Sequence, residues 1–136
     1  MEAWREQRVQ EIFQRFTSLF DLTILEHTDD EIHARWHVDK TVLNPADIAH
    51  GGAVFSVTDA ICAALGLRNN HLLTKSVSFY YYHSVLPGDA YITASFQKVG
   101  SYTSVMAAEV RQEGKLCAKG MFDMAYMPQA EQIEME

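Results

Sequence analysis

The sequence has 136 residues, of which 48% are hydrophobic and 21% are charged, and its formal net charge is −7. This length suits one domain with its own core, and the composition is that of an ordinary globular protein. The negative charge argues against a nucleic-acid partner, because phosphate backbones select basic surfaces, but it does not exclude an anionic ligand.

The predicted elements begin with a helix over residues 2–20, where apolar side chains recur at helical spacing between charged ones. Residues 22–38 contain two segments that flank a polar tetrapeptide, which is typical of a β-hairpin. An apolar run then predicts one long helix from Gly51 to Gly66, since glycine suits a helix C-terminus. That helix is apolar on nearly every side, so we expect it to be buried.

Four segments rich in β-branched and aromatic residues follow the long helix and extend to residue 127. Their short connections predict an antiparallel meander. The acidic residues 129–136 are expected to fray. The element order predicts a single α+β domain over residues 1–136, in which an antiparallel sheet of about six strands wraps round the long helix.

From this pattern we expect neither a membrane span nor a secretion signal. No apolar run reaches the ~18 residues that a span requires, and the N-terminus is a charged amphipathic pattern. Cys62 and Cys117 have no framework or metal-ligand spacing, so we expect free thiols in a reducing cytoplasm. His33 and His37 share a strand face without a third ligand, so no metal site is expected.

Asp59 is a carboxylate within the apolar helix, and no lysine or arginine stands within a turn or two of it. Aspartate is seldom fully buried without a partner. In one interpretation Asp59 faces solvent at a gap in the sheet or pairs with a distant cation. In the other, a partly desolvated cleft holds it as a general base or a nucleophile.

The triplet His50-Gly51-Gly52 stands where the long helix begins. Two glycines leave the first backbone amides uncovered by any Cβ, at the positive end of the helix dipole. Such amides bind an anion or a developing oxyanion, although a glycine pair is also common in plain loops.

Gly51 and Asp59 are eight residues apart in the sequence, which corresponds to about 12 Å along a helix. One reacting carbonyl cannot lie within ~3 Å of both groups in the same chain. If both act on it, one group must come from a second copy. The sequence therefore predicts a homodimer with two shared sites, formed by antiparallel helices across a two-fold axis.

The same residues resemble the signature of hotdog-fold acyl-CoA thioesterases of the phenylacetate-degradation (PaaI) type. That signature joins an asparagine, a His-Gly-Gly triplet six residues later, and an aspartate nine residues after the histidine. The resemblance covers about residues 20–127, and every spacing holds. The matching residues are Asn44, His50, Gly51, Gly52 and Asp59.

The resemblance implies dimers that often pair into tetramers, and hydrolysis of an acyl-CoA thioester, with an aryl or medium-chain acyl group, without a metal or redox cofactor. It implies that Asp59 is catalytic, as the general base that activates water or as the nucleophile that forms a mixed anhydride. The Gly51 amide would hold the thioester oxygen, and His50 and Asn44 would orient that oxygen or the catalytic groups. Gly52 would contact the substrate beside them.

Thr74 matches the serine or threonine that family members often carry where the strand after the helix begins, and it is a candidate substrate-binding residue. The alternation along this strand places Thr74 with Ser76 and Ser78. The apolar Val77 and Phe79 would point to the other face. With this alternation Thr74 would point away from the apolar face, where it could still line a subunit interface.

Three departures from the family pattern accompany these matches, in the loop before the helix, at the end of the strand after it, and in an unusually aromatic run. Asp47 stands where a glycine is usual between the asparagine and the histidine, and His83-Ser84 replaces a common arginine-proline pair. The aromatic run over residues 79–82 is interpreted as half core and half subunit interface, or as part of a pocket for aryl groups. Several basic residues near the late strands could contact coenzyme A phosphates, and the sequence does not choose among them.

The alternatives belong to other functional classes. A hotdog dehydratase would need a glutamate in the central helix, and none is there. A non-catalytic acyl-CoA-binding or sensor protein shares the expected fold, and the late strands resemble it. Ser56 lacks the Gly-x-Ser-x-Gly elbow of a serine hydrolase, and Cys62 has no base nearby in the sequence to activate it.

Overall fold

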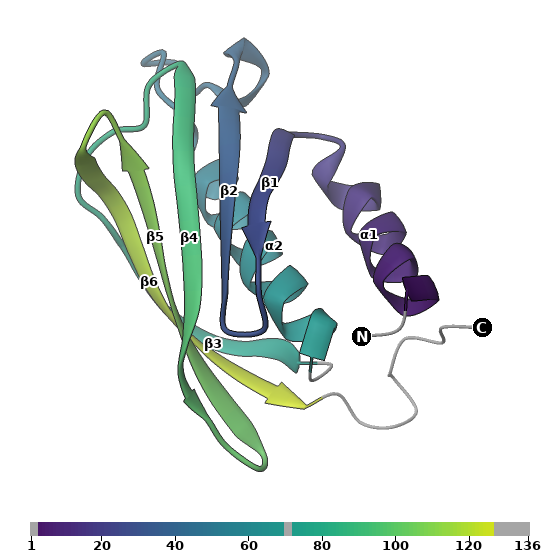
Figure 1. Ribbon diagram of the computed structural model, residues 1–136. Coiled ribbons are helices and arrows are strands. Elements are labelled where there is room, and N and C mark those ends of the chain that lie inside the picture. Colours follow the sequence, from purple (N-terminus) through teal and green to yellow (C-terminus); the bar gives the residue numbers. More distant parts are fainter. Residues whose placement is uncertain (1–2, 70–71, 127–136) are drawn as a thin grey trace.

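The computed structural model describes residues 3–69 and 72–126 and is shown in Figure 1. The acidic tail predicted over residues 129–136 lies outside these described residues. In chain order the elements are α1 (Ala3–Thr17), β1 (Asp21–His27), β2 (Glu31–Val38), the 3-10 helix η1 (Lys40–Val42), α2 (Gly51–Asn69), β3 (Leu72–Tyr81), β4 (Gly88–Val99), β5 (Thr103–Gln112) and β6 (Lys115–Tyr126).

The strands form one six-stranded antiparallel sheet in the order β1-β2-β4-β5-β6-β3. The sheet curves round α2, and α1 packs against α2 (Figure 1). Val57, Ile61 and Leu65 of α2 are fully buried, as is Trp36 of β2. The predicted α+β class, with an antiparallel sheet round a buried central helix, is confirmed. Neither described helix combines the length and the apolar character needed to cross a membrane.

The predicted meander of four strands is wrong for β3. Strands β4, β5 and β6 are consecutive neighbours, but β3 pairs with β6 and not with β4. The reason is that β2 already occupies the other side of β4, from Glu31 opposite Ser95 to Val38 opposite Gly88. Strand β3 therefore lies at an edge of the sheet, and residues 82–87 cross to β4.

Both predicted helix ends differ from the observed ones. α1 ends at Thr17 rather than residue 20, and the Thr17 hydroxyl donates to the Phe13 carbonyl oxygen at 2.7 Å. α2 continues past Gly66 to Asn69. A Cβ at Gly66 would lie 3.1 Å from the Cβ of Leu72, so this glycine permits the close approach of β3 to the helix rather than a helix stop.

The turn between β5 and β6 offers a test of local backbone strain. Glu113 and Gly114 have φ values of 48° and 79°, so both central residues of this two-residue hairpin are left-handed. Asparagine tolerates this conformation better than glutamate. We expect Glu113→Asn to raise the free energy of unfolding by about 0.5–1 kcal/mol, measured by urea denaturation at constant m-value. Glu113→Ala removes the same charge without easing the backbone and should not stabilise the protein.

Candidate active site

The start of α2 is fixed by contacts with segments on either side of it. The amide of Ala49 donates to the Val85 carbonyl oxygen at 2.8 Å, and the amide of His50 donates to the Val42 carbonyl oxygen at 2.8 Å. The ring Nδ1 of His50 accepts the amide of Gly52 at 2.9 Å, so His50 caps the helix. In the neutral ring the proton is therefore on Nε2, on the exposed side chain.

The amide of Gly51 is the free donor at this helix start. Within residues 3–69 and 72–126 this amide has no hydrogen-bond acceptor, whereas the neighbouring amide of Gly52 donates to His50. The Tyr81 hydroxyl donates to the Gly51 carbonyl oxygen at 2.8 Å, and a Cβ at Gly51 would lie 3.5 Å from Cζ of that ring. The free amide and the positive end of the helix dipole suit a partial negative charge.

Asn44 shapes the loop that leads into the helix. Its side-chain Oδ1 accepts the amides of Ala46 at 2.9 Å and Ile48 at 3.4 Å. Asp47 has a φ of 61°, the left-handed conformation that glycine adopts most readily. Aspartate tolerates this conformation better than most residues, so the loop keeps its turn without the glycine of the family pattern. Asn44 and Gly51 both line a cavity of about 260 Å³.

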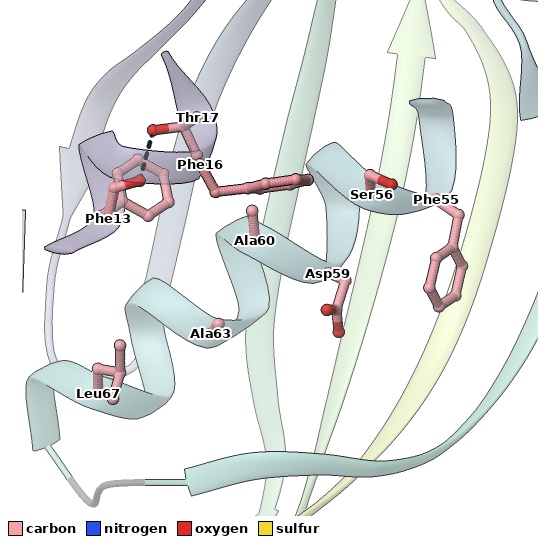
Figure 2. Close-up of a pocket in the computed structure, with 9 residues that line it drawn as sticks. All are labelled: Phe13, Phe16, Thr17, Phe55, Ser56, Asp59, Ala60, Ala63 and Leu67. Carbon is pink, nitrogen blue, oxygen red and sulfur yellow. Dashed lines mark hydrogen bonds between the residues drawn. The ribbon is translucent and has the colours of Figure 1, made fainter. Parts of the chain in front are cut away.

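Asp59 lies half-buried on α2, and its side chain contacts β3 directly. Its Oδ1 accepts a hydrogen bond from the Thr74 hydroxyl at 2.8 Å. In Figure 2 the Asp59 carboxylate points from α2 toward the strand that follows the helix. The Thr74 hydroxyl also lies 3.3 Å from the sulfur of Met124, so its position is fixed from two sides.

The predicted strand phase for Thr74 is wrong. The register of β3 on β6 shifts between Thr74 and Ser76, which is the mark of a β-bulge. Thr74 is paired with the buried Met124, while Ser76 is paired with the exposed Asp123. The extra residue at the bulge thus turns Thr74 to the inner face, toward α2. The pairing with Asp59 could not be deduced from alternation, because alternation assumes an unbroken strand.

A cavity of about 290 Å³ adjoins Asp59 between the two helices (Figure 2). Its polar lining within the described residues comes from Thr17, Ser56 and Asp59, and the remainder is apolar. Of the lining residues, sequence reasoning predicted only Asp59 as a site residue, and it missed those of α1 because the helical pattern of the N-terminal segment indicated only a face that packs on the body. The lining consists of Phe13, Phe16 and Thr17 from α1, and Phe55, Ser56, Asp59, Ala60, Ala63 and Leu67 from α2.

The structure divides the predicted site residues into two groups. Asp59 and Thr74 are joined by a hydrogen bond near the middle of α2. His50, Gly51 and Gly52 lie at its start, with Asn44 in the preceding loop, and Asp59 does not line their cavity. A single chain therefore does not bring the free Gly51 amide and the Asp59 carboxylate together.

Two other groups of side chains bear on alternative chemistries, the Cys62 thiol and the possible metal ligands. Burial raises the pKa of the Cys62 thiol far above its ordinary value, and the charge of Asp59 acts in the same direction, so a thiolate at Cys62 is disfavoured. No three side chains of histidine, cysteine, aspartate or glutamate in residues 3–69 and 72–126 are grouped as a metal site. His37 instead lies 2.8 Å from the Asp89 carboxylate.

Comparisons with known proteins agree with this architecture. A family model described as "Acyl-CoA thioesterase N-terminal domain" matches residues 40–125. The chain is 30% identical over 122 residues to "Putative esterase F42H10.6" of Caenorhabditis elegans. The aligned stretch covers 85% of this chain and 72% of that protein.

Two solved structures share the whole architecture. The PaaI protein from the phenylacetic acid degradation operon of E. coli has a TM-score of 0.84 at 18% identity, covering 93% of this chain and 94% of that one. A hypothetical thioesterase of Streptococcus pneumoniae TIGR4, solved with coenzyme A, has a TM-score of 0.83 at 25% identity, covering 88% of this chain and 98% of that one.

Proposed function

Since the chain belongs to the hotdog-fold acyl-CoA thioesterases and is a thioester hydrolase, we propose that Asp59 of one subunit and the Gly51 amide of a second act on one thioester carbonyl. The observation that carries this proposal is that α2 holds both a half-buried carboxylate, bound by Thr74, and a free amide at the helix start, too far apart in one chain to act on the same carbonyl. The substrate is an acyl-CoA with an aryl or medium-chain acyl group, and no cofactor takes part.

Asp59 supplies the base or the nucleophile. Thr74 occupies Oδ1 of the carboxylate, which leaves Oδ2 to act. As a base, Oδ2 takes a proton from water while the hydroxide oxygen adds to the thioester carbon. As a nucleophile, Oδ2 adds to that carbon itself, and water then hydrolyses the mixed anhydride. Either way the carbon–sulfur bond breaks, and coenzyme A leaves as a thiolate that takes up a proton.

Gly51 supplies the donor for the oxyanion that forms when the thioester carbonyl is attacked. Its amide is fixed by the helix and needs no reorganisation during the reaction, which is the property that makes such donors effective. His50 keeps the adjacent Gly52 amide occupied, so Gly51 is the amide left for the substrate oxygen. Asn44 holds the loop before the helix, and Gly52 and Thr74 complete the surroundings of the substrate.

The free edge of β3 indicates how two subunits would share the site. Thr74 and Tyr81 lie at opposite ends of this edge strand, and they contact Asp59 and Gly51 respectively. Antiparallel pairing of two β3 strands about an axis near the middle of the strand would bring Thr74 close to Tyr81 of the partner subunit. The exposed backbone of an edge strand favours such pairing.

The exposed tyrosines support the same interface. Tyr80, Tyr81 and Tyr82 are 64%, 54% and 53% exposed in the single chain. Aromatic side chains are enriched in interfaces, and covering these three would remove a large apolar surface from water. We propose a homodimer on this edge, with further pairing of dimers into tetramers, to be measured by light scattering.

The test of the function is the steady-state release of free thiol from acetyl-, hexanoyl-, octanoyl-, dodecanoyl-, benzoyl- and phenylacetyl-CoA. Turnover of at least one octanoyl-sized or aryl substrate is expected. Binding of every acyl-CoA without release of thiol would contradict the proposal.

The hydrogen bond from Thr74 gives a further prediction. Thr74→Val keeps the shape of the side chain and removes the donor, so kcat should fall about tenfold to hundredfold while KM changes little. Thr74→Ser keeps the hydroxyl and should recover most of the loss. Ser76→Ala, on the outer face of the same strand, is the matched control. A Thr74→Val enzyme with unchanged kcat would remove Thr74 from the mechanism.

A further inference from the structure

The cavity beside Asp59 has one wall that the family match does not include. Phe13, Phe16 and Thr17 of α1 form this wall, whereas the family model begins at residue 40. The residues opposite them belong to α2, inside the match. Features of the cavity that α1 decides therefore lie outside the stretch that the family model matches.

Phe16 is held in place although its side chain is 48% exposed. Its ring meets the ring of Phe20 edge-on at 5.5 Å between centroids, and Phe20 meets Trp36 edge-on at 6.4 Å. Trp36 is fully buried, and Thr17, next to Phe16, is only 6% exposed. The end of α1 is thus anchored to the core through edge-to-face aromatic contacts, so the wall has a defined position.

The opposite side of the cavity is equally fixed and has an aromatic face of its own. The ring of Phe55 lies 5.3 Å from Phe79 and 6.2 Å from Phe122, measured between ring centroids. Between the two walls α2 presents the small side chains of Ala60 and Ala63, which leave the space open (Figure 2). An acyl group whose carbonyl lies at Asp59 would enter between aromatic rings.

Phe16 also lines a second cavity. The second cavity, of about 440 Å³, is lined by Phe16 and Ser56 as well, and it extends to His50 and Gly52 at the start of α2. Removal of the Phe16 ring would join the two spaces. With the ring in place, the cavity at Asp59 is about 290 Å³, which is at the lower limit of the ~300–1,000 Å³ usual for drug-sized ligands.

We propose that α1 forms one wall of the acyl-binding pocket and that Phe16 sets the size limit of the acyl group. The pocket accepts a compact acyl group, an aryl group or a chain of medium length, and the Phe16 ring blocks longer chains. An aryl group gains edge-to-face contacts with Phe16 and Phe55 in addition to its burial. The proposal rests on the proposed role of Asp59, because that role places the acyl carbonyl at the mouth of this cavity.

The test compares kcat/KM for acetyl-, octanoyl-, dodecanoyl- and phenylacetyl-CoA between the full-length wild-type enzyme and variants of the pocket. Phe16→Ala should raise the dodecanoyl-to-octanoyl ratio at least tenfold, since even one methylene changes specificity on that scale. Phe16→Leu should give a smaller shift in the same direction. Ala63→Phe, which fills the cavity, should lower the phenylacetyl-to-acetyl ratio at least tenfold.

Leu19→Ala is the matched control, because Leu19 follows α1 closely, is 68% exposed and lines neither cavity. Its substrate profile should equal that of the wild type. The proposal would be overturned if the dodecanoyl-to-octanoyl ratio of kcat/KM stayed unchanged in both Phe16→Ala and Phe16→Leu. It would also be overturned if these variants changed the oligomeric mass of the protein but not this ratio. If the wild type hydrolyses no acyl-CoA, or Asp59→Asn keeps full activity, the proposed function itself fails, which is a separate outcome.

Discussion

Asp59→Asn is expected to lower kcat by a factor on the order of 10² to 10⁴, because the amide can neither accept the proton of water nor attack the thioester. The substitution keeps the shape of the side chain, and its carbonyl oxygen can still accept the hydrogen bond from Thr74. The fold should therefore persist, which a thermal melt would verify. The measurement is steady-state thiol release on the best substrate of the panel.

Asp123→Asn is the control for this change. Asp123 is exposed on the outer face of β6 and lies opposite Ser76. It carries the same charge as Asp59 but has no contact with the cavity, so its loss should leave kcat near the wild-type value. A folded Asp59→Asn enzyme with near-native kcat would contradict the catalytic assignment.

An isotope measurement then separates the two roles of Asp59. In a single turnover in ¹⁸O-water, a general base sends the label into the released acid. A nucleophile whose anhydride is cleaved at the aspartyl carbon retains the label in its own carboxyl group, where mass spectrometry of the Asp59 peptide detects it. Label in that peptide would establish the covalent route.

Gly51→Pro is expected to lower kcat by a factor on the order of 10² or more, because proline lacks the amide hydrogen that binds the oxyanion. Proline is well tolerated at the first position of a helix, which is where Gly51 stands, so the helix start should survive. Gly51→Ala retains the amide, and its Cβ would make only ordinary contact with Tyr81 at 3.5 Å. It should therefore lose far less activity than Gly51→Pro.

A mixture of two inactive variants tests whether the site is shared between subunits. In a mixed dimer of Asp59→Asn and Gly51→Pro, one site receives both lesions and the other receives neither. Random exchange makes about half of the dimers mixed, each with one intact site, so about a quarter of the wild-type activity should return. Mixed dimers confirmed by mass spectrometry yet inactive would refute the shared site, while leaving the chemistry of Asp59 open.

The sequence by itself predicted those features that depend on residues close together along the chain. The buried helix follows from an apolar run with few polar residues, and its start follows from the two glycines after His50. The separation of Gly51 and Asp59 follows from the rise of a helix, which is the same in any protein. These features are local, so one segment is enough to determine them.

The tertiary structure alone decided how the strands and the wall of the cavity are placed. The bulge that turns Thr74 toward Asp59 reverses the period-two pattern of β3. No residue in this segment predicts the bulge from its type alone. The pairing of β3 with β6 depends on a strand that is distant in the sequence. The place of Gly66 inside α2 depends on the close approach of β3, which follows the helix. Phe16 reaches the cavity only because Phe20 and Trp36 hold the end of α1 beside α2. Folding brings such residues together from distant parts of the chain. The periodicity of a single strand or helix therefore cannot predict their contacts.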